Sequence, residues 1–164
     1  MSSNPSLTQL QSILIEHRLV TLEQMQYTVE TAGGDGEFTW LELLLLWHLV
    51  EEQHVVTHIE ALAKVPRCDL ERLSHIPHDV LAMVPADVAL EHRVVPVGVE
   101  PDGDLRIAMV DPTDEAAIEE LEFFCDRRIL REAAPASAVA WALHAYYGAN
   151  SALWPPGQYE RSAA

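Results

Sequence analysis

The sequence predicts an α+β fold in which a helical N-terminal subdomain of about four helices precedes a small subdomain with the element order ββαβα. Two observations support this class. Apolar residues recur at helical spacing over the first third of the chain, whereas they alternate with a period of two on either side of residue 100. A chain of 164 residues is also long enough for two small subdomains packed together. The expected organisation is a helical subdomain over residues 1–66, a helical connector over 67–92, an α+β subdomain over 93–148 and a flexible tail over 149–164.

Two helices are expected before residue 33. The first spans residues 7–17, with Ser6 as its N-cap. The second begins after Thr21, which a glutamine follows three residues later as in a capping box, and it ends near Ala32. A glycine-rich loop at residues 33–36 is expected to separate it from the next helix.

Two further helices complete the predicted helical subdomain. One starts at Thr39, which a glutamate follows three residues later, and it spans residues 40–50. This segment is apolar nearly all round, so we expect it to be buried on several sides. The other starts at Thr57, with a glutamate at the same spacing, and continues through Lys64 until Pro66 interrupts it.

A tandem repeat is predicted within these helices. Residues 14–21 align with residues 50–57 at a shift of 36, and the two copies share a glutamate, a valine and a threonine. In each copy a helix end, a short link and a capped helix start follow in the same order. This order favours a tandem helix-pair module over two independent helix pairs.

The second half of the chain begins with a connector of two brief helices, interrupted at Pro77 and Pro85. Alternating segments on both sides of a Pro-Asp-Gly-Asp turn then indicate a β-hairpin. The expected elements are strands 94–99 and 105–110, a helix capped by residues 111–113, a strand over 128–133 and a helix over 135–147 that Gly148 closes. One apolar face of the helix after the hairpin is predicted to hold Ala117, Ile118, Leu121, Phe124 and Cys125.

The charge of the chain excludes several classes of partner. There are 26 acidic and 10 basic residues, which gives a net charge of −16. Such a field repels phosphate backbones and anionic lipids, so we expect no nucleic acid as a partner. Apolar runs are too short for membrane insertion, and the first residues lack the pattern of a secretory signal, so the expected location is the cytoplasm.

Motifs for catalysis are absent from the sequence. No phosphate-binding loop occurs, and the single lysine, Lys64, follows no glycine-rich segment, so the chain is not expected to be an enzyme. Cys125 is interpreted as a small buried hydrophobe rather than a nucleophile. Asp111, which precedes a proline, is expected to cap a turn or a helix start.

No metal site or cofactor is expected either. Cys68, Asp69, His75 and His78 include residue types that zinc prefers, but a proline separates the two histidines and no second ligand pair has a strong spacing. His54 and His58 lie four residues apart, yet the helix start predicted at Thr57 would remove their shared helix face.

Several segments, taken together, resemble a known family. They are His-Ile-Pro at 75–77, Val-Pro-Ala at 84–86, the strand segments 92–97 and 105–112, and the closing helix 138–148. In this order they look like the N-terminal domain of the type II secretion and type IV pilus assembly ATPases, and the resemblance covers residues 7–148. It implies four helices packed before an α+β portion.

In some members of that family, tandem motifs bind cyclic di-GMP through glycines, an arginine and spaced leucines. The positions that match the first motif are Gln9 for the arginine, Gln11 and Arg18 for two glycines, and Leu10, Leu14, Met25 and Val29 for the apolar contacts. In the second copy no arginine is evident, and Gln53 or His54 replaces a glycine. Side chains at glycine positions obstruct a close approach of the ligand to the backbone, so we expect that the nucleotide site is lost.

The resemblance and the absent motifs together predict a non-catalytic regulatory or adaptor module. Its expected partner is a protein, such as a secretion, pilus or motility component or its regulator. The alternative is a cyclic di-GMP sensor with a remodelled site. A sensor should have a concave apolar site between the helix pairs with an arginine nearby, whereas an adaptor should expose an apolar or acidic patch.

Overall fold

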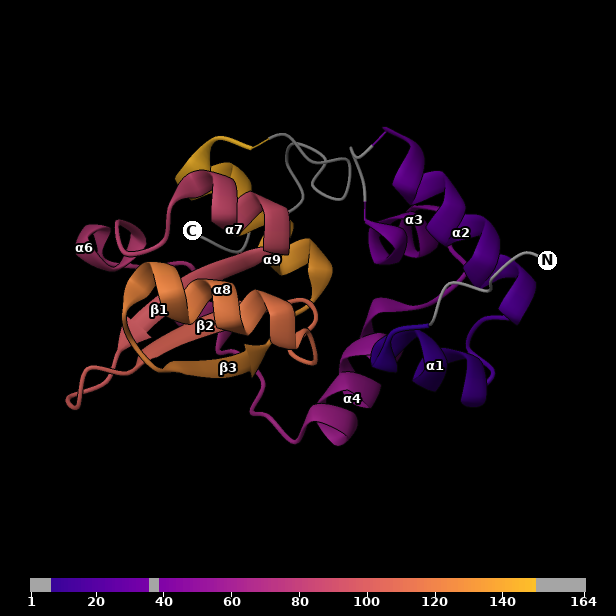
Figure 1. The fold of residues 1–164 in the computed structure, drawn as a ribbon, viewed down its shortest axis with the longest axis horizontal. Coiled ribbons are helices and arrows are strands. Elements are labelled where there is room, and N and C mark those ends of the chain that lie inside the picture. Colours follow the sequence, from indigo (N-terminus) through magenta and orange to yellow (C-terminus); the bar gives the residue numbers. More distant parts are fainter. Residues whose placement is uncertain (1–6, 36–38, 150–164) are drawn as a thin grey trace.

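The computed structural model describes residues 7–35 and 39–149. Four helices, α1–α4, lie together on one side of the molecule, and a three-stranded sheet with its own helices lies on the other (Figure 1). The predicted α+β class is confirmed. The tail segment with Trp154 and Tyr159 lies outside the described residues. The helical side comprises α1 (Gln9–Glu16), α2 (Leu22–Asp35), α3 (Trp40–Leu46) and α4 (Glu52–Ala63).

Capping boxes define the starts of three of these helices. At the start of α1 the N-cap is Thr8 rather than Ser6, because the Thr8 hydroxyl accepts a hydrogen bond from Gln11 N at 3.2 Å while Gln11 Oε1 accepts one from Thr8 N at 2.9 Å. The predicted boxes at Thr21 and Thr39 are confirmed. The box predicted at Thr57 is wrong, because Thr57 lies inside α4 and its hydroxyl donates to the carbonyl of Gln53 one turn earlier.

Two other helix boundaries also differ from the predictions. Helix α2 continues past Ala32 to Asp35, so Gly33 and Gly34 are helical. Glycine costs about 1 kcal/mol in a helix interior relative to alanine, which lowers helix stability without preventing the helix. Helix α3 ends at Leu46 instead of residue 50, since the chain turns at His48, whose φ is 55°.

The tandem repeat exists in the structure at a shift of 30 for the turns after α1 and α3, and of 31 for their N-caps Thr8 and Thr39, rather than the predicted 36. Both α1 and α3 end in the same turn, with a left-handed residue at Arg18 (φ 60°) and at His48 (φ 55°). Each turn closes with a backbone hydrogen bond of 3.0 Å, from Leu19 N to Leu14 O and from Leu49 N to Leu44 O. His48 is therefore the counterpart of Arg18, and Gln53 and His54 lie instead on the surface of α4.

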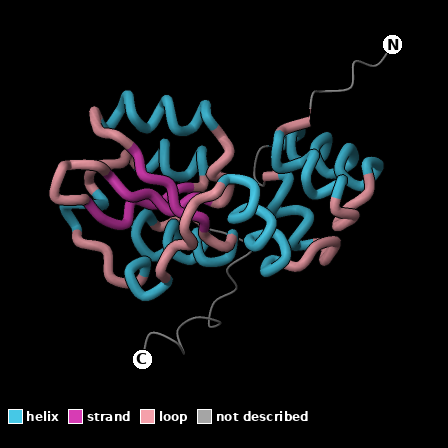
Figure 2. Tube along the Cα trace, turned by 90° about the horizontal axis from the view of Figure 1, so that it is seen from below, coloured by secondary structure: helices cyan, strands magenta, loops and turns pink. Residues whose placement is uncertain are grey.

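The sheet has the strand order β1-β2-β3. Strands β1 (Val94–Val99) and β2 (Leu105–Met109) form the predicted antiparallel hairpin, and β3 (Ile129–Ala133) lies parallel to β2 after the crossover helix α8 (Glu115–Cys125). Helices lie on both faces of the sheet (Figure 2). The remaining elements are α5 (Leu70–Leu73), α6 (His78–Leu81), α7 (Ala86–His92) and α9 (Ala136–Tyr147), so the connector holds three short helices where two were predicted.

The segment that leaves α4 joins the free edge of β3. Cys68 N donates to Ala133 O at 2.8 Å, and Ala133 N donates to Pro66 O at 2.9 Å. Burial and the neighbouring Glu132 raise the pKa of the Cys68 thiol to about 12. The helical side is thus attached to the sheet by backbone hydrogen bonds as soon as α4 has ended.

The apolar face of α8 is only partly as predicted. Ala117, Ile118 and Leu121 are buried against the sheet. Phe124, however, is 51% exposed, and Cys125 is half-buried. The last turn of α8 is therefore less buried than the sequence predicts. Within residues 7–35 and 39–149, no helix is both long enough and apolar enough to cross a bilayer.

Candidate functional site

The predicted dinucleotide positions lie on α1, α2 and the turn between them. Leu10, Leu14 and Met25 are completely buried and form part of the core, and Val29 packs against it. Their burial explains these residue types without any ligand. Gln9 and Arg18 are exposed.

The two predicted glycine positions differ from each other. Gln11 is buried and has helical backbone conformation, and its side chain forms part of the capping box with Thr8. Arg18 occupies the left-handed conformation that glycine adopts most easily, but it adds a long cationic side chain there. Arg18 therefore keeps a backbone conformation typical of glycine. At both positions, however, a side chain fills the space that a glycine would leave open.

A cleft of about 510 Å³ lies between the helical side and the sheet side of the molecule. One wall comes from the end of α2 and the start of α3, and the other from the end of α7, the end of β2 and the start of α8. The cleft combines aromatic and apolar surface with several carboxylates and one arginine. Its lining residues are Ala32, Thr39, Trp40, Leu41, Glu91, His92, Arg93, Val110, Asp111 and Asp114.

An ion pair crosses between the two walls near this cleft. Arg93 Nε lies 2.7 Å from Glu42 Oε1, and the Arg93 guanidinium also donates to the Leu90 carbonyl. The Glu42 side chain is 7% exposed, and that of Arg93 is 24% exposed. In this low-dielectric setting a charge-assisted hydrogen bond fixes the start of α3 to the end of α7.

Asp111, on the sheet side of the cleft, caps a turn as predicted. Its Oδ1 accepts a hydrogen bond from Thr113 N at 3.0 Å and another from the Thr113 hydroxyl. Burial raises the pKa of the Asp111 carboxyl. The helix start is capped instead by Asp114, whose Oδ1 accepts from Ala117 N at 3.1 Å.

The last turn of α8 carries Phe123, the most exposed aromatic side chain among the described residues. Phe123 is 82% exposed, and its ring meets that of Phe124 edge to face with 5.8 Å between centroids. Exposed Glu119 and Glu122 lie on the same helix. We call this set the Phe123 patch. Sequence reasoning missed Phe123, although its place outside the spacing of Ala117, Ile118 and Leu121 already indicates the solvent side of the helix.

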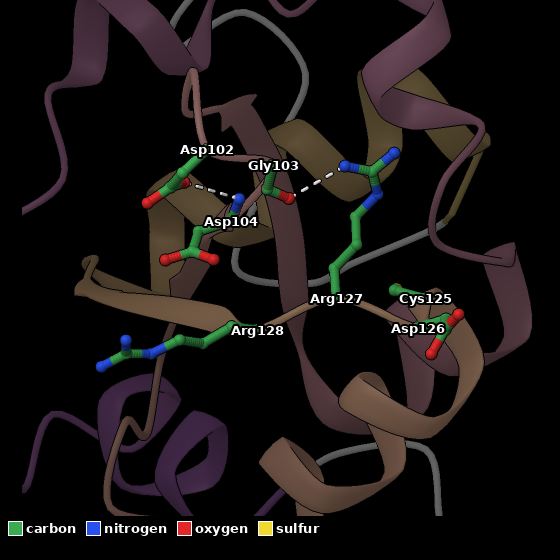
Figure 3. A pocket seen from close by; sticks show the side chains of 7 residues that line it. All are labelled: Asp102, Gly103, Asp104, Cys125, Asp126, Arg127 and Arg128. Carbon is green, nitrogen blue, oxygen red and sulfur yellow. Dashed lines mark hydrogen bonds between the residues drawn. The ribbon is translucent and has the colours of Figure 1, made fainter.

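A second pocket, of about 440 Å³, lies between the hairpin turn and the segment that joins α8 to β3 (Figure 3). Arg127 donates to the Gly103 carbonyl at 2.9 Å, and Asp104 N donates to Asp102 Oδ1 at 3.0 Å. Gly103 has a φ of 98°, which the turn requires. The Arg127 bond joins the turn to the segment after α8, whereas the Asp102 bond lies within the turn itself.

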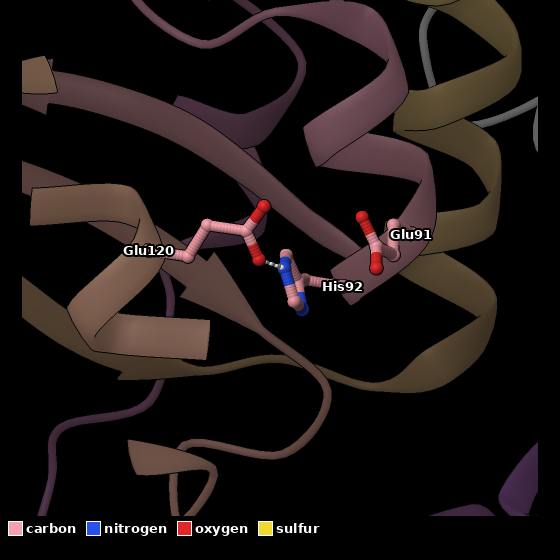
Figure 4. A group of neighbouring side chains, drawn as sticks. All are labelled: Glu91, His92 and Glu120. Carbon is pink, nitrogen blue, oxygen red and sulfur yellow. Dashed lines mark hydrogen bonds and ion pairs between the residues drawn. The ribbon is translucent and has the colours of Figure 1, made fainter. Parts of the chain in front are cut away.

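The candidate metal ligands lie differently from the expectation. His54 and His58 share a helix face on α4 after all, and the His58 Nδ1 lies 2.6 Å from the His54 carbonyl oxygen. The ring of His58 also packs on that of His17, with 4.7 Å between centroids. Among the residues that the structure describes, one group of three metal-ligating side chains has all its ligand atoms within reach of one another: Glu91, His92 and Glu120 (Figure 4).

Comparison with known proteins gives consistent matches. A model of the MshEN domain matches residues 63–153. The type IV pilus assembly ATPase PilB of Thermus thermophilus is 28% identical over 90% of this chain, and PilB of Myxococcus xanthus is 26% identical over 84%. The chain spans only 16% and 24% of the lengths of these two relatives.

Solved structures show the same fold. A structure of MshE with cyclic di-GMP has a TM-score of 0.58 and 25% identity, and the match covers 86% of this chain and all of that chain. Two structures of the N-terminal domain of XpsE have TM-scores of 0.56 and 0.63 at 20% and 19% identity, and cover 88% and 86% of this chain and 98% and 97% of theirs. The XpsE matches support the fold alone. The predicted resemblance to N-terminal domains of secretion and pilus ATPases is confirmed, and because the family model covers more than half of the sequence, the chain belongs to the MshEN domain family.

Proposed function

We propose that this chain is a non-catalytic regulatory or adaptor module that acts in the cytoplasm by contacting a secretion, pilus or motility protein or its regulator. The matched relatives are ATPases, of which the chain spans a small part, and its 164 residues contain no phosphate-binding loop. The observation that carries the proposal is the Phe123 patch.

The physical argument concerns the surface that Phe123 leaves in water. Burying a phenylalanine side chain stabilises a complex by about 1.5–3 kcal/mol, so an 82% exposed ring is a strong candidate anchor. Glu119 and Glu122 place negative charge around the aromatic pair, and the whole chain carries a net charge of −16. A partner with an apolar pocket bordered by lysine or arginine would complement this surface.

Site-specific photocrosslinking in cells tests this function. A photoreactive phenylalanine analogue at position 123 is expected to capture a defined protein, whereas the same analogue at Tyr27, 65% exposed on α2, should not capture it. The captured protein is then purified, and its affinity for the unaltered chain is compared with that for Phe123→Ser and for Tyr27→Ser.

We expect at least tenfold weaker binding for Phe123→Ser, which corresponds to about 1.4 kcal/mol, and unchanged binding for Tyr27→Ser. Equal affinities of Phe123→Ser and the unaltered chain would show that the Phe123 patch does not make the contact. Circular dichroism of each variant verifies that it is folded.

One observation favours a second candidate, a cyclic di-GMP sensor with a remodelled site. The similar structure of MshE contains cyclic di-GMP, and its match covers 86% of this chain. Gln9, Gln11 and Arg18 argue against conventional binding, since an amide replaces the arginine and side chains occupy both glycine positions.

Isothermal titration with cyclic di-GMP, with ATP as the control, separates the two candidates. The adaptor proposal expects no saturable heat at micromolar ligand. Saturable binding of cyclic di-GMP alone would establish the sensor, and Arg18→Gly would then show whether the side chain at that position limits the affinity.

A further inference from the structure

We propose that Glu91, His92 and Glu120 form a binding site for a divalent transition-metal ion of the zinc type, at the contact between α7 and α8. Their candidate ligand atoms all lie within 4.8 Å of one another. His92 Nε2 and Glu120 Oε2 are already 2.5 Å apart. Figure 4 shows the His92 ring between the two glutamates, with Glu120 reaching it from α8 and Glu91 beside it on α7.

The backbone explains why these side chains meet. His92 is the last residue of α7, and Arg93 then turns the chain with a φ of 52° into β1. Glu120 lies in the middle of α8, 28 residues further along the chain. The His92 side chain is 13% exposed and is therefore held in place, whereas that of Glu120 is 36% exposed and Glu91 is exposed. One ligand is fixed by packing, and the other two can adjust around an ion that enters from solvent.

The donor set suits zinc. Zinc binds imidazole nitrogen and carboxylate oxygen at about 2.0–2.2 Å, and three protein ligands with one water complete a tetrahedron. Ligand atoms around such an ion are separated by roughly 3.4 Å, so the present separations of 2.5–4.8 Å bracket the required value. To bind the ion, His92 and Glu120 must move slightly apart and Glu91 must move closer, and the two glutamates are the less buried members of the group.

The surrounding charges also favour a cation. Asp111 and Asp114 line the same cleft as Glu91 and His92. The arginine in the cleft lining, Arg93, directs its Nε to Glu42 at 2.7 Å. In a chain with a net charge of −16, the field at this point attracts a divalent cation.

A bound ion would join α7 to α8 and so would hold in place the helix whose last turns carry the Phe123 patch. The site does not depend on the proposed function, because its ligands lie outside that patch. A competing hypothesis is that zinc binds the histidines of the helical side, where His17 and His58 pack together. The experiment has to separate these two locations.

The test is isothermal titration of the chelator-treated full chain with Zn²⁺ alone. We expect one ion bound per chain, with at least tenfold weaker binding in Glu120→Gln, because loss of a ligand should exceed the 10- to 100-fold effect of losing a residue that only supports one. Glu119→Gln removes the same charge from the neighbouring exposed position of α8 and should bind as the unaltered chain does. His58→Gln should also leave the affinity unchanged.

Thermal unfolding followed by circular dichroism provides a second measurement. An ion that binds only the folded state stabilises that state. Zn²⁺ should therefore raise the melting temperature of the unaltered chain and of Glu119→Gln, and it should not change the melting temperature of Glu120→Gln. Equal zinc affinity of Glu120→Gln and the unaltered chain would overturn the proposal. So would no binding by the unaltered chain, or a loss of binding in His58→Gln alone.

Discussion

The two helix pairs have the same arrangement of elements but differ at the third residue of their first helices. In α1 the third helical residue is Gln11, and its amide is used within the capping box with Thr8. In α3 the same position is Glu42, which closes the box with Thr39 and also accepts a hydrogen bond from Arg93 on the sheet side of the molecule. The first helix pair is thus self-contained at its cap, whereas the cap of the second also connects it to the rest of the chain.

The largest expected effect comes from breaking that connection. Arg93→Met leaves the Glu42 carboxylate buried without its cationic partner, and such a loss costs about 3 kcal/mol of unfolding free energy. Urea denaturation measures it. Glu42→Gln copies the first pair and should cost less, because the amide oxygen can still accept from Thr39 N. The double variant should therefore be more stable than Arg93→Met. If Arg93→Met lowers the unfolding free energy by less than about 1 kcal/mol, water replaces the arginine at Glu42 at little cost.

Removal of the two N-caps should show the same asymmetry at a smaller scale. Thr8→Ala should cost about 1 kcal/mol, the usual value for an N-cap threonine. Thr39→Ala should cost more, because the Thr39 hydroxyl also donates to the Glu42 oxygen that Arg93 contacts. Paired urea denaturation curves of the two variants give the comparison, and identical losses would contradict a role of the second cap outside its own helix.

The shared turn should respond alike in both pairs. Arg18→Gly and His48→Gly should each increase the unfolding free energy by about 0.5 kcal/mol, since glycine adopts the left-handed conformation without strain but loses more entropy on folding. Glu16→Gly, two residues earlier in right-handed helix, serves as the control and should be destabilising. Thermal unfolding of the three variants at one pH shows which of them are stabilised and which are destabilised. A loss of stability in both turn variants would show that the Arg18 and His48 side chains make favourable contacts.

The smallest effect concerns the second helix of each pair. Thr21 caps α2 through its hydroxyl, whereas Glu51 at the start of α4 makes no side-chain capping bond. Glu51→Thr should therefore stabilise the chain by about 0.5 kcal/mol. Glu51→Ala removes the same carboxylate without supplying a hydroxyl, and the difference between the two melting temperatures isolates the cap.

Local chemistry explains which parts of the fold were predictable. The hairpin, the boxes at Thr21 and Thr39 and the closing Gly148 depend on residues within a few positions of one another, and each was predicted from them. Thr57 has the spacing of a capping box but lies inside a helix, because the turn at His48 already sets where α4 begins. A left-handed histidine at a helix end has no signal as clear as a glycine.

The candidate sites depended on contacts between distant segments. Leu10, Leu14 and Met25 could be assigned to an apolar face from spacing, but spacing does not separate a core from a ligand site. The pairs Glu42–Arg93 and His92–Glu120 join residues 51 and 28 positions apart. Only the tertiary fold brings the start of α3 and the middle of α8 to the end of α7, where these side chains meet.

The edge segment after α4 has a mechanical consequence. Since Pro66 and Cys68 are hydrogen-bonded to Ala133 on β3, the two sides of the molecule are not joined by a slack tether. A force that pulls the helices away from the sheet would act on these two hydrogen bonds and on the ion pair between Arg67 and Glu60 before the connecting segment could extend. A displacement of the four N-terminal helices would therefore move the edge strand β3 as well.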